Sequence, residues 1–238
     1  MSGYKPICFQ NEDGTFDGYD VTIIREGARR LNVEIDFVVF PWESLLTSLD
    51  ADKCQVVSCT LWRTPERLTR YTMGTVPYFE QGAQLLIRSD STGITDLASL
   101  AGKSVGTTVG DAWTTFLEDY NAENGNPLEL RYYSEDIATV IQDIANGRID
   151  ATLNDPTVMY EKILALGLVD QVKLVGDLQG SGFCYIATQL SPAGIAIRDA
   201  FDEVYLEMIK DGTVKRICEE WFGTDYTKYL LDNIVIEN

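Results

Sequence analysis

The sequence predicts an α/β fold, because strand-like and helix-like segments alternate along most of its 238 residues. Short runs rich in Val, Ile and Leu alternate with longer stretches in which apolar residues recur every three or four positions. Turns that contain Gly, Asp or Pro separate these segments. The composition, 45% hydrophobic and 24% charged residues, is that of a globular chain long enough to bury a large core.

The first third of the chain predicts two helices and three strands. Asp20 is expected to cap a helix that runs to about Leu31, with Val21, Ile24 and Ala28 on one face of it. The segments that follow are an expected strand at 33–40, a short helix at 42–53, a buried strand at 55–60 and a strand at 82–88.

The remaining sequence predicts a second unit of alternating strands and helices and then two further helices. Ser134 is expected to be the N-cap of a helix that ends before Gly147. The expected strands are 104–108, 128–133, 148–155 and 172–177. Besides the helix capped by Ser134, one expected helix opens at Asp111 and others span 157–167, 192–210 and 213–221.

Three expected strand ends carry polar groups of different kinds. Thr60 ends one strand with Arg67 just beyond it, Gly110-Asp111-Ala112 opens a helix, and Asp155 ends a third strand. In open α/β sheets, ligands bind beyond the carboxyl ends of parallel strands. A cation, a set of helix N-terminal amides and an anion at these ends together predict a receptor for a zwitterion.

The composition excludes several classes of protein and site. The formal net charge of −18 disfavours nucleic acid and anionic membrane surfaces as partners. Histidine is absent, so histidine triads and histidine-ligated metals are excluded. The five cysteines lack CxxC spacing, so we expect no zinc site. We expect no other metal and no cofactor. The cysteines are expected to be buried thiols, although one disulfide remains possible. No run of about 18 apolar residues and no secretory signal is present.

Five segments, taken in order, resemble the type II periplasmic amino-acid-binding proteins of ABC transporters, solute-binding protein family 3. The resemblance implies two lobes joined by two hinge strands, lobe 1 at 1–87 plus 184–238 and lobe 2 at 88–183. It also implies a monomer without catalytic activity that closes around a small zwitterion and delivers it to a membrane ABC permease. The expected location is the periplasm or the outside of the cell, with a membrane tether possible. The segments are GYKPICFQNEDGTFDGYDVTI, RTPER before VPYFEQGAQLLIR, LAGKSVGTTVGDAW, ANGRIDATLNDP and MIKDGTVKRICEEWFG.

The resemblance assigns roles to residues at the three strand ends. It implies that Arg67 grips the ligand carboxylate, for which a guanidinium is well matched, while Arg63 faces solvent. Asp155 would take the ligand ammonium and the Thr60 carbonyl would accept a second hydrogen bond from it. Ala112 would offer its backbone N–H to the carboxylate, where the family usually has Ser or Thr.

Aromatic residues are expected to enclose the ligand. Tyr4 and Trp42 fall where the family places rings against the ligand. Trp62 departs from the family pattern, which has a small hydroxyl residue there, and resembles members that bind compatible solutes such as ectoine. The three rings would form a partial cage for a cationic ligand of the ectoine or betaine type, as an alternative to a plain amino acid.

The two chain ends predict an unusual topology. The family begins with a strand before the GYKP loop, and here the β-branched run NIVIEN follows the last helix. We therefore expect a circular permutation, natural or engineered, with Asn233–Glu237 in the sheet of lobe 1. Glu237 would then lie at the cleft mouth, where members that bind cationic side groups carry an acid.

Two other functions share this architecture. One is a dehydratase for arogenate-like or prephenate-like acids, but Val158 stands where such enzymes use a carboxylic acid, and no general acid is evident. The other is the ligand-binding domain of a receptor or sensor kinase. Flanking sequence would distinguish this function from that of a transporter component.

Overall fold

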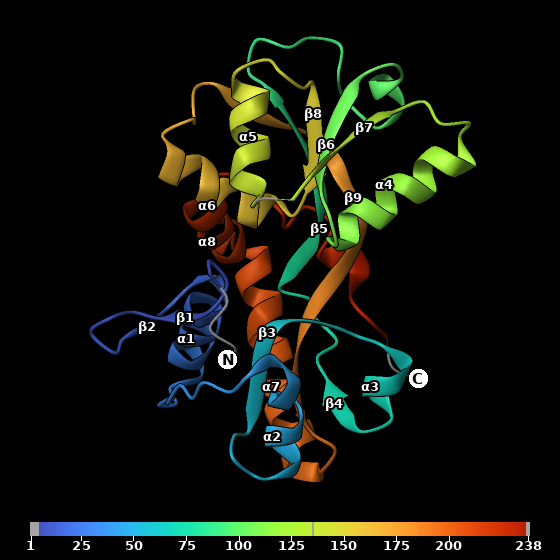
Figure 1. Ribbon diagram of the computed structural model, residues 1–238. Coiled ribbons are helices and arrows are strands. Elements are labelled where there is room, and N and C mark those ends of the chain that lie inside the picture. Colours follow the sequence, from blue (N-terminus) through green and yellow to red (C-terminus); the bar gives the residue numbers. More distant parts are fainter. Residues whose placement is uncertain (1–4, 135, 237–238) are drawn as a thin grey trace. The chain divides into compact units, whose positions relative to one another are not determined.

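The structure is a computed structural model that describes residues 5–134 and 136–236 (Figure 1). The chain separates into two compact units, which we call unit 1 (residues 1–81 with 182–238) and unit 2 (residues 82–181). It passes from one unit to the other within two strands, β5 (Phe79–Arg88) and β9 (Val172–Gln189). The lobe boundaries predicted above, after residues 87 and 183, fall in the same two strands, and the action of these strands as hinges stays a prediction.

Unit 1 is built on a small antiparallel sheet. β3 (Val56–Trp62) and β4 (Tyr71–Met73) both pair with the C-terminal part of β9. Helix α1 (Tyr19–Leu31) packs against α7 (Pro192–Lys210) and α8 (Thr213–Phe222). The smaller elements are β1 (Phe9–Gln10), β2 (Phe16–Asp17), η1 (Trp42–Ser44), α2 (Thr47–Asp50), α3 (Pro65–Leu68) and η3 (Leu231–Asn233).

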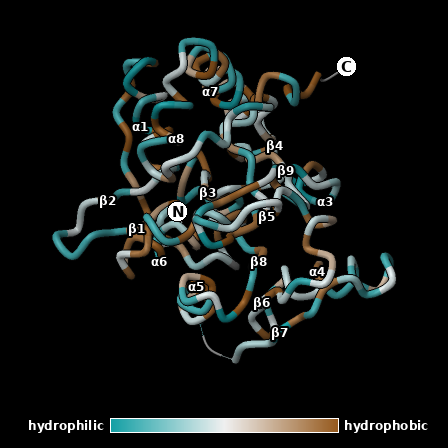
Figure 2. Tube along the Cα trace, turned by 90° about the horizontal axis from the view of Figure 1, so that it is seen from above, coloured by the Kyte–Doolittle hydropathy of each residue, from teal (hydrophilic) through white to brown (hydrophobic). Residues whose placement is uncertain are grey.

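The core of unit 1 is rich in aromatic rings. The ring centroid of Tyr19 lies 4.9 Å from that of Phe79 and 5.0 Å from that of Phe222, and all three side chains are buried. Such tilted ring pairs stabilise a core beyond the area that they bury. In contrast to this core, the turn between β1 and β2 is largely hydrophilic (Figure 2).

Three expectations for unit 1 are wrong in detail. Helix α1 begins at Tyr19 and its N-cap is Gly18, so Asp20 lies inside the helix. The expected helix at 42–53 is two short pieces, η1 and α2. Residues 33–40 are not assigned to a strand, and Val33 and Val38 are 52% and 46% exposed. β-Branched composition favours a strand only where another strand pairs with it, and no strand pairs with residues 33–40 in the described chain.

The expected strand at Asn233–Glu237 is also not observed. Asn233 ends the 3-10 helix η3, and residues 234–236 belong to no strand. One backbone hydrogen bond, from Val235 N to Thr75 O at 2.9 Å, fixes this tail, while Ile236 is 85% exposed. The strand assignment is therefore wrong for the residues that the structure describes, and the circular permutation gains no support. Glu237 lies outside the described residues.

Unit 2 is a mixed sheet covered on both faces. β5 pairs antiparallel with β8 (Ala151–Asn154), and β6 (Ser104–Thr108) pairs parallel with both β8 and β7 (Glu129–Tyr133). Helix α4 covers one face, and α5 and α6 cover the other (Figure 1). These helices span Ala112–Glu123, Ile137–Ala145 and Pro156–Leu166, and a short 3-10 helix, η2, spans Ala98–Leu100.

Alternating side chains on β5 explain the two faces of unit 2. Leu85 and Ile87 pack with the residues of α4, and Leu86 between them packs with α5 and α6. This alternation is the period of two that a strand imposes. One cap prediction is wrong here, because Asp136 rather than Ser134 caps α5 by accepting a hydrogen bond from Ala138 N at 3.1 Å.

None of the five cysteines forms a disulfide within the described residues. Four of them are buried, and Cys54 is partly exposed. The Sγ atoms of Cys8 and Cys59 lie 3.2 Å apart in the interior of unit 1. Within the described residues, no helix combines the length and apolar character needed to span a bilayer.

Candidate functional site

The end of β3 has an unusual backbone conformation. The register with β9 shifts between Val57 and Leu61, and Thr60, inside this irregular stretch, has φ of +45°. A β-branched residue rarely adopts positive φ, so surrounding contacts must hold it there. Thr60 is buried, at 7% exposed, and its backbone N–H donates to Asp20 Oδ2 and to the Tyr78 hydroxyl, each at 3.0 Å.

Asp20 is the acceptor beneath this stretch. It is fully buried, and its Oδ2 accepts hydrogen bonds from Tyr78 OH at 2.9 Å and Ser58 Oγ at 3.2 Å as well as from Thr60 N. Burial raises the pKa of Asp20 to about 7, with nearby Cys8 adding to the rise, while the three hydrogen bonds oppose it. The sequence predicts only a capping role for Asp20, although a carboxyl group within an apolar helix face is the signal that indicates a buried role.

Arg67 follows directly in the short helix α3. Thr64 caps that helix by accepting a hydrogen bond from Arg67 N at 3.2 Å. The Arg67 guanidinium donates from Nη1 to the carbonyl of Trp62 at 2.8 Å, which ties it to the end of β3. Among the described residues, no carboxylate lies within ion-pair distance of this guanidinium, so its charge is available to an anion.

Trp62 packs against β9. A Cβ on Gly182 would lie 2.7 Å from the indole, so the ring rests directly on the backbone there. The indole Nε1 is buried and lacks a hydrogen-bond partner in the part of the chain that the structure describes. Trp62 is thus partly a packing residue of unit 1, with one unused donor. Trp42, by contrast, is 50% exposed on η1.

Arg63 is not the solvent-facing residue that we expected. Its Nη1 donates to the carbonyls of Met73 and Gly74, at 3.2 and 2.5 Å, and its guanidinium lies 5.7 Å from the ring centroid of Tyr185. It therefore connects the end of β3 to the chain after β4. The TPER pattern distinguished the two arginines but did not indicate this structural role for Arg63.

The predicted residues of unit 2 lie at one edge of its sheet. β6 and β8 are parallel, so the residues that follow them come out on the same side. Asn154 Nδ2, at the end of β8, donates to Asp111 Oδ2 at 3.1 Å, and Asp111 Oδ1 caps α4 through Trp113 N at 2.8 Å. Ala112 is the first residue of that helix, where N–H groups lack intrahelical acceptors.

Asp155 is both a cap and a buried acid. Its Oδ1 accepts from Thr157 N at 2.8 Å and from Thr157 Oγ1 at 2.7 Å, which starts helix α6 after the Asp-Pro step. The side chain is only 8% exposed. The helix cap fixes the orientation of the carboxyl group at the edge that also carries Ala112.

The structure thus assembles the predicted residues in two separate sets. Thr60, Trp62 and Arg67 are linked within unit 1 by backbone and side-chain contacts, and Ala112 and Asp155 share an edge of unit 2. No hydrogen bond or ring contact among the described residues joins Trp42 to the first set. Tyr4 lies outside the described residues, as Glu237 does.

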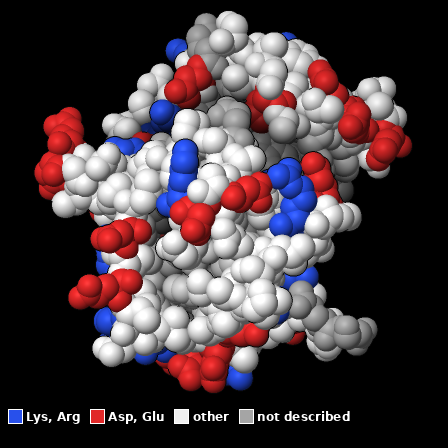
Figure 3. Space-filling view, turned by 90° about the horizontal axis from the view of Figure 1, so that it is seen from below, with Lys and Arg blue, Asp and Glu red and all other residues white. Residues whose placement is uncertain are grey.

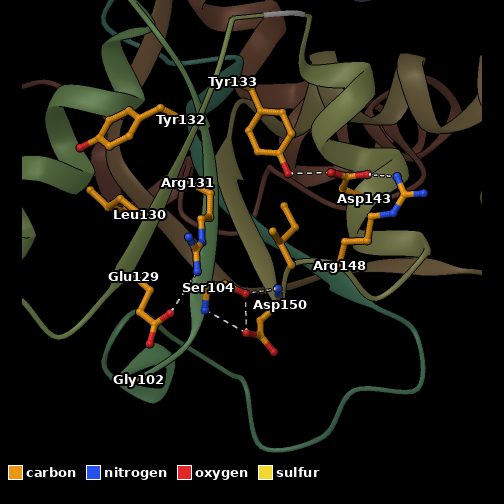
Figure 4. A pocket seen from close by; sticks show the side chains of 11 residues that line it. Gly102, Ser104, Glu129, Leu130, Arg131, Tyr132, Tyr133, Asp143, Arg148 and Asp150 are labelled. Carbon is orange, nitrogen blue, oxygen red and sulfur yellow. Dashed lines mark hydrogen bonds and ion pairs between the residues drawn. The ribbon is translucent and has the colours of Figure 1, made fainter.

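A polar hollow of about 740 Å³ in unit 2 lies apart from these residues (Figure 4). It runs along β7, and its charged side chains already have partners. Arg148 pairs with Asp143 at 2.7 Å, Asp143 accepts from Tyr133 OH at 2.8 Å, and Asp150 accepts from Ser104 Oγ at 2.7 Å. We therefore place no ligand site there.

Comparison with known proteins connects this architecture to a family. Residues 1–224 match the family described as bacterial extracellular solute-binding proteins, family 3. The L-cystine-binding protein TcyJ of Escherichia coli strain K12 is 32% identical over 233 residues, covering 94% of this chain and 81% of that protein. The L-cystine-binding protein TcyK of Bacillus subtilis strain 168 is 27% identical over 226 residues, covering 94% and 82%.

Solved structures agree with this relationship. The L-cystine solute receptor of Neisseria gonorrhoeae, in its unliganded open conformation, superposes with a TM-score of 0.80 at 25% identity and covers 95% of this chain and 92% of that one. The predicted fold, a two-lobed α/β fold of the type II periplasmic-binding-protein class, is confirmed. The family is described as solute-binding proteins, and both curated relatives are named as L-cystine-binding proteins. The chain belongs to the bacterial extracellular solute-binding proteins, family 3.

Proposed function

We propose that this protein binds a zwitterionic amino acid outside the cytoplasm and delivers it, as a monomer, to a membrane ABC permease. The observation that carries the proposal is the Arg67 guanidinium, held by the Trp62 carbonyl at 2.8 Å and without a carboxylate partner among the described residues. A guanidinium fixed in this way suits a ligand α-carboxylate, because it offers a bidentate fork that keeps its charge.

The residues of unit 2 supply the complementary contacts in this proposal. The Ala112 N–H, at the start of a 12-residue helix, adds a donor for the carboxylate, and Asp155 accepts from the ammonium group. The Thr60 carbonyl, in the irregular part of β3, is the second acceptor. Trp42 and Trp62 provide ring surface for the side chain of the ligand.

L-Cystine is the first ligand to test, because the relatives at 32% and 27% identity are named for binding it. An ectoine or betaine type of ligand, which the indole at residue 62 suggested, belongs in the same panel. The packing of that indole against Gly182 leaves it less surface for a cation, which favours an amino acid.

A thermal-shift screen followed by calorimetry tests the proposal. A true ligand at about 100 times its dissociation constant should stabilise the protein by about 2.7 kcal/mol. Cystathionine, a thioether analogue of similar length, separates binding from thiol–disulfide exchange with the protein. Free cysteine, other L-amino acids, glycine betaine and ectoine complete the panel.

Two variants make the screen specific. Arg67→Ala should abolish the shift, whereas Arg70→Ala, which removes an exposed guanidinium paired with Asp50, should retain it. A full shift in Arg67→Ala, or no shift with any member of the panel in the unmodified protein, would contradict the proposal.

A further inference from the structure

We propose that Asp20 is a positioning residue of the ligand site, because its buried carboxylate holds the backbone of Thr60 in the left-handed conformation that presents the end of β3 to the ligand. This inference rests on the proposed function, since it takes the Thr60 carbonyl as a ligand contact. Asp20 itself is fully buried, so we assign it no direct contact with the ligand.

The first step is the energetic cost of the backbone at Thr60. A non-glycine residue held in this region costs about 1–3 kcal/mol, and a β-branched residue is poorly suited to it. Thr60, with φ of +45°, keeps this conformation because its N–H has two buried acceptors, Asp20 Oδ2 and Tyr78 OH, each at 3.0 Å. Tyr78 OH in turn donates to the same carboxylate oxygen at 2.9 Å.

The second step is the reach of this arrangement into the site. The turn at Thr60 sets the direction in which β3 continues to Trp62. The carbonyl of Trp62 receives the Arg67 guanidinium at 2.8 Å. One carboxylate therefore supports both the proposed acceptor for the ammonium and the orientation of the proposed donor for the carboxylate.

The third step concerns the charge on Asp20. Its Oδ2 is the acceptor of all three hydrogen bonds, and an ionised carboxylate accepts more strongly than a carboxylic acid. Its Oδ1 is buried and has no hydrogen-bond partner among the described residues, so this oxygen can be protonated without breaking a hydrogen bond. Burial raises the pKa of Asp20 to about 7, so the two forms exchange near neutral pH.

The three tyrosines around Asp20 stay neutral in this range. The titratable side chains that face it are Cys8 from the N-terminal segment, Tyr19 beside it on α1, Tyr78 before β5 and Tyr205 on α7. Burial raises the pKa of each of the three tyrosines well above its ordinary value. No basic side chain is among these neighbours.

The test compares Asp20→Asn with a matched variant, Asp202→Asn. Asp202 is also a buried acid of unit 1, where it accepts from Thr75 N and Val76 N. The dissociation constant for L-cystine is measured by calorimetry from about pH 5.5 to about pH 8.5. In the unmodified protein and in Asp202→Asn, affinity should fall about tenfold as the pH drops through 7, whereas Asp20→Asn should be about tenfold weaker at high pH and independent of pH.

A rescue experiment separates positioning from general stability. Glycine adopts positive φ without a side-chain penalty, so Thr60→Gly should make the backbone less dependent on Asp20. The Asp20→Asn substitution should then weaken binding only about twofold in the Thr60→Gly background, against about tenfold in the parent. An equal loss in both backgrounds would overturn the proposal.

Hydrogen exchange supplies an arm that needs no ligand. Peptides covering residues 58–62 should exchange about tenfold faster in Asp20→Asn than in the parent, and at the parent rate in Asp202→Asn. If L-cystine fails to bind the unmodified protein, the proposed ligand is wrong, and unchanged exchange in Asp20→Asn overturns the positioning role separately. If Asp20→Asn does not fold, Tyr78→Phe, which removes the other acceptor of the Thr60 N–H, takes its place in both measurements.

Discussion

Asp20 occupies a helix face that otherwise consists of apolar residues. Tyr19, Val21 and Ile24 around it are buried, and the carboxyl group would be costly to bury without its three donors. A buried polar group that is satisfied by a strained backbone segment is more informative than the apolar residues that surround it. Such residues point to the part of a fold where conformation matters for function.

The stability of the protein should depend on the protonation of Asp20. Because burial raises its pKa from 3.8 to about 7, the native state binds a proton that the unfolded state has released over this interval. The contribution of this bound proton to the free energy of unfolding is fully present below about pH 4. It is lost as the pH rises to about 7, and the free energy of unfolding falls by up to about 1.4 kcal/mol per pH unit. Urea unfolding across this range should show a flatter dependence in Asp20→Asn.

The control for this measurement is Asp119→Asn, which removes an exposed acid on α4. It should leave the slope of stability against pH as it is in the unmodified protein. An identical slope in Asp20→Asn and in Asp119→Asn would contradict the prediction.

Single residues also show how far the sequence could predict the site. Strand ends and motif order indicate Thr60, Arg67 and Asp155 as site candidates, and the helix caps at Asp111 and Asp155 are local features that short patterns reveal. The roles of Asp20 and Arg63 depend on contacts with residues 40 and 10 or more positions away along the chain. Such contacts are set by the tertiary fold and have no local signal.

At the level of elements, the start of α5 illustrates competition between two possible caps. Ser134 and Asp136 are both good N-cap residues, and only Asp136 accepts the hydrogen bond from Ala138 N. Asp136→Ala should therefore destabilise the protein by about 1 kcal/mol, and Ser134→Ala should change its stability by less than about 0.5 kcal/mol. Chemical denaturation of both variants distinguishes the caps, and the reverse order would show that the helix begins earlier.

The first turn of α7 allows a second prediction. A Cβ at Gly194 would lie 2.0 Å from the carbonyl oxygen of Gln189, which is backbone and cannot move aside. Gly194→Ala should cost about 3 kcal/mol or more. Gly106→Ala in β6 is the comparison, because its Cβ would meet side chains rather than backbone, namely those of Ile149, Val140 and Tyr133. We expect a smaller cost of about 1–2 kcal/mol. Equal losses in thermal unfolding would contradict this ranking.

The elements that were mispredicted share a physical cause. The segments at 33–40 and 234–236 are β-branched and strand-like in sequence, yet neither is assigned to a strand in the structure. Strand formation depends on pairing and on a face to pack against, and neither is visible in a short run of residues. The longer helices and the strands β3, β5 and β6 were predictable because their apolar patterns match the faces that they bury.

For the whole molecule, charge is the dominant surface property. The net charge is −18, and acidic side chains are spread over the face in Figure 3 with fewer basic ones among them. Repulsion between like charges destabilises the compact state, and salt screens it. The screening length falls from about 30 Å at 0.01 M salt to about 8 Å at 0.15 M. Raising the salt concentration between these values at neutral pH should therefore raise the melting temperature.

The same experiment near the isoelectric point is the control. At about pH 4.3, where the sequence predicts no net charge, added salt should have little effect on the melting temperature. A salt effect of the same size at both pH values would show that ion binding, rather than repulsion, is responsible.

The division of the chain has a consequence for its biosynthesis. Unit 2 is one uninterrupted stretch, 82–181, and can begin to fold as soon as it leaves the ribosome or a translocation channel. Unit 1 has its first and last parts separated by those hundred residues, and α1 packs against α7 and α8 from the last part. The apolar face of the early segment therefore stays exposed until α7 and α8 have been synthesised. During this interval we expect a chaperone that prevents aggregation to bind it.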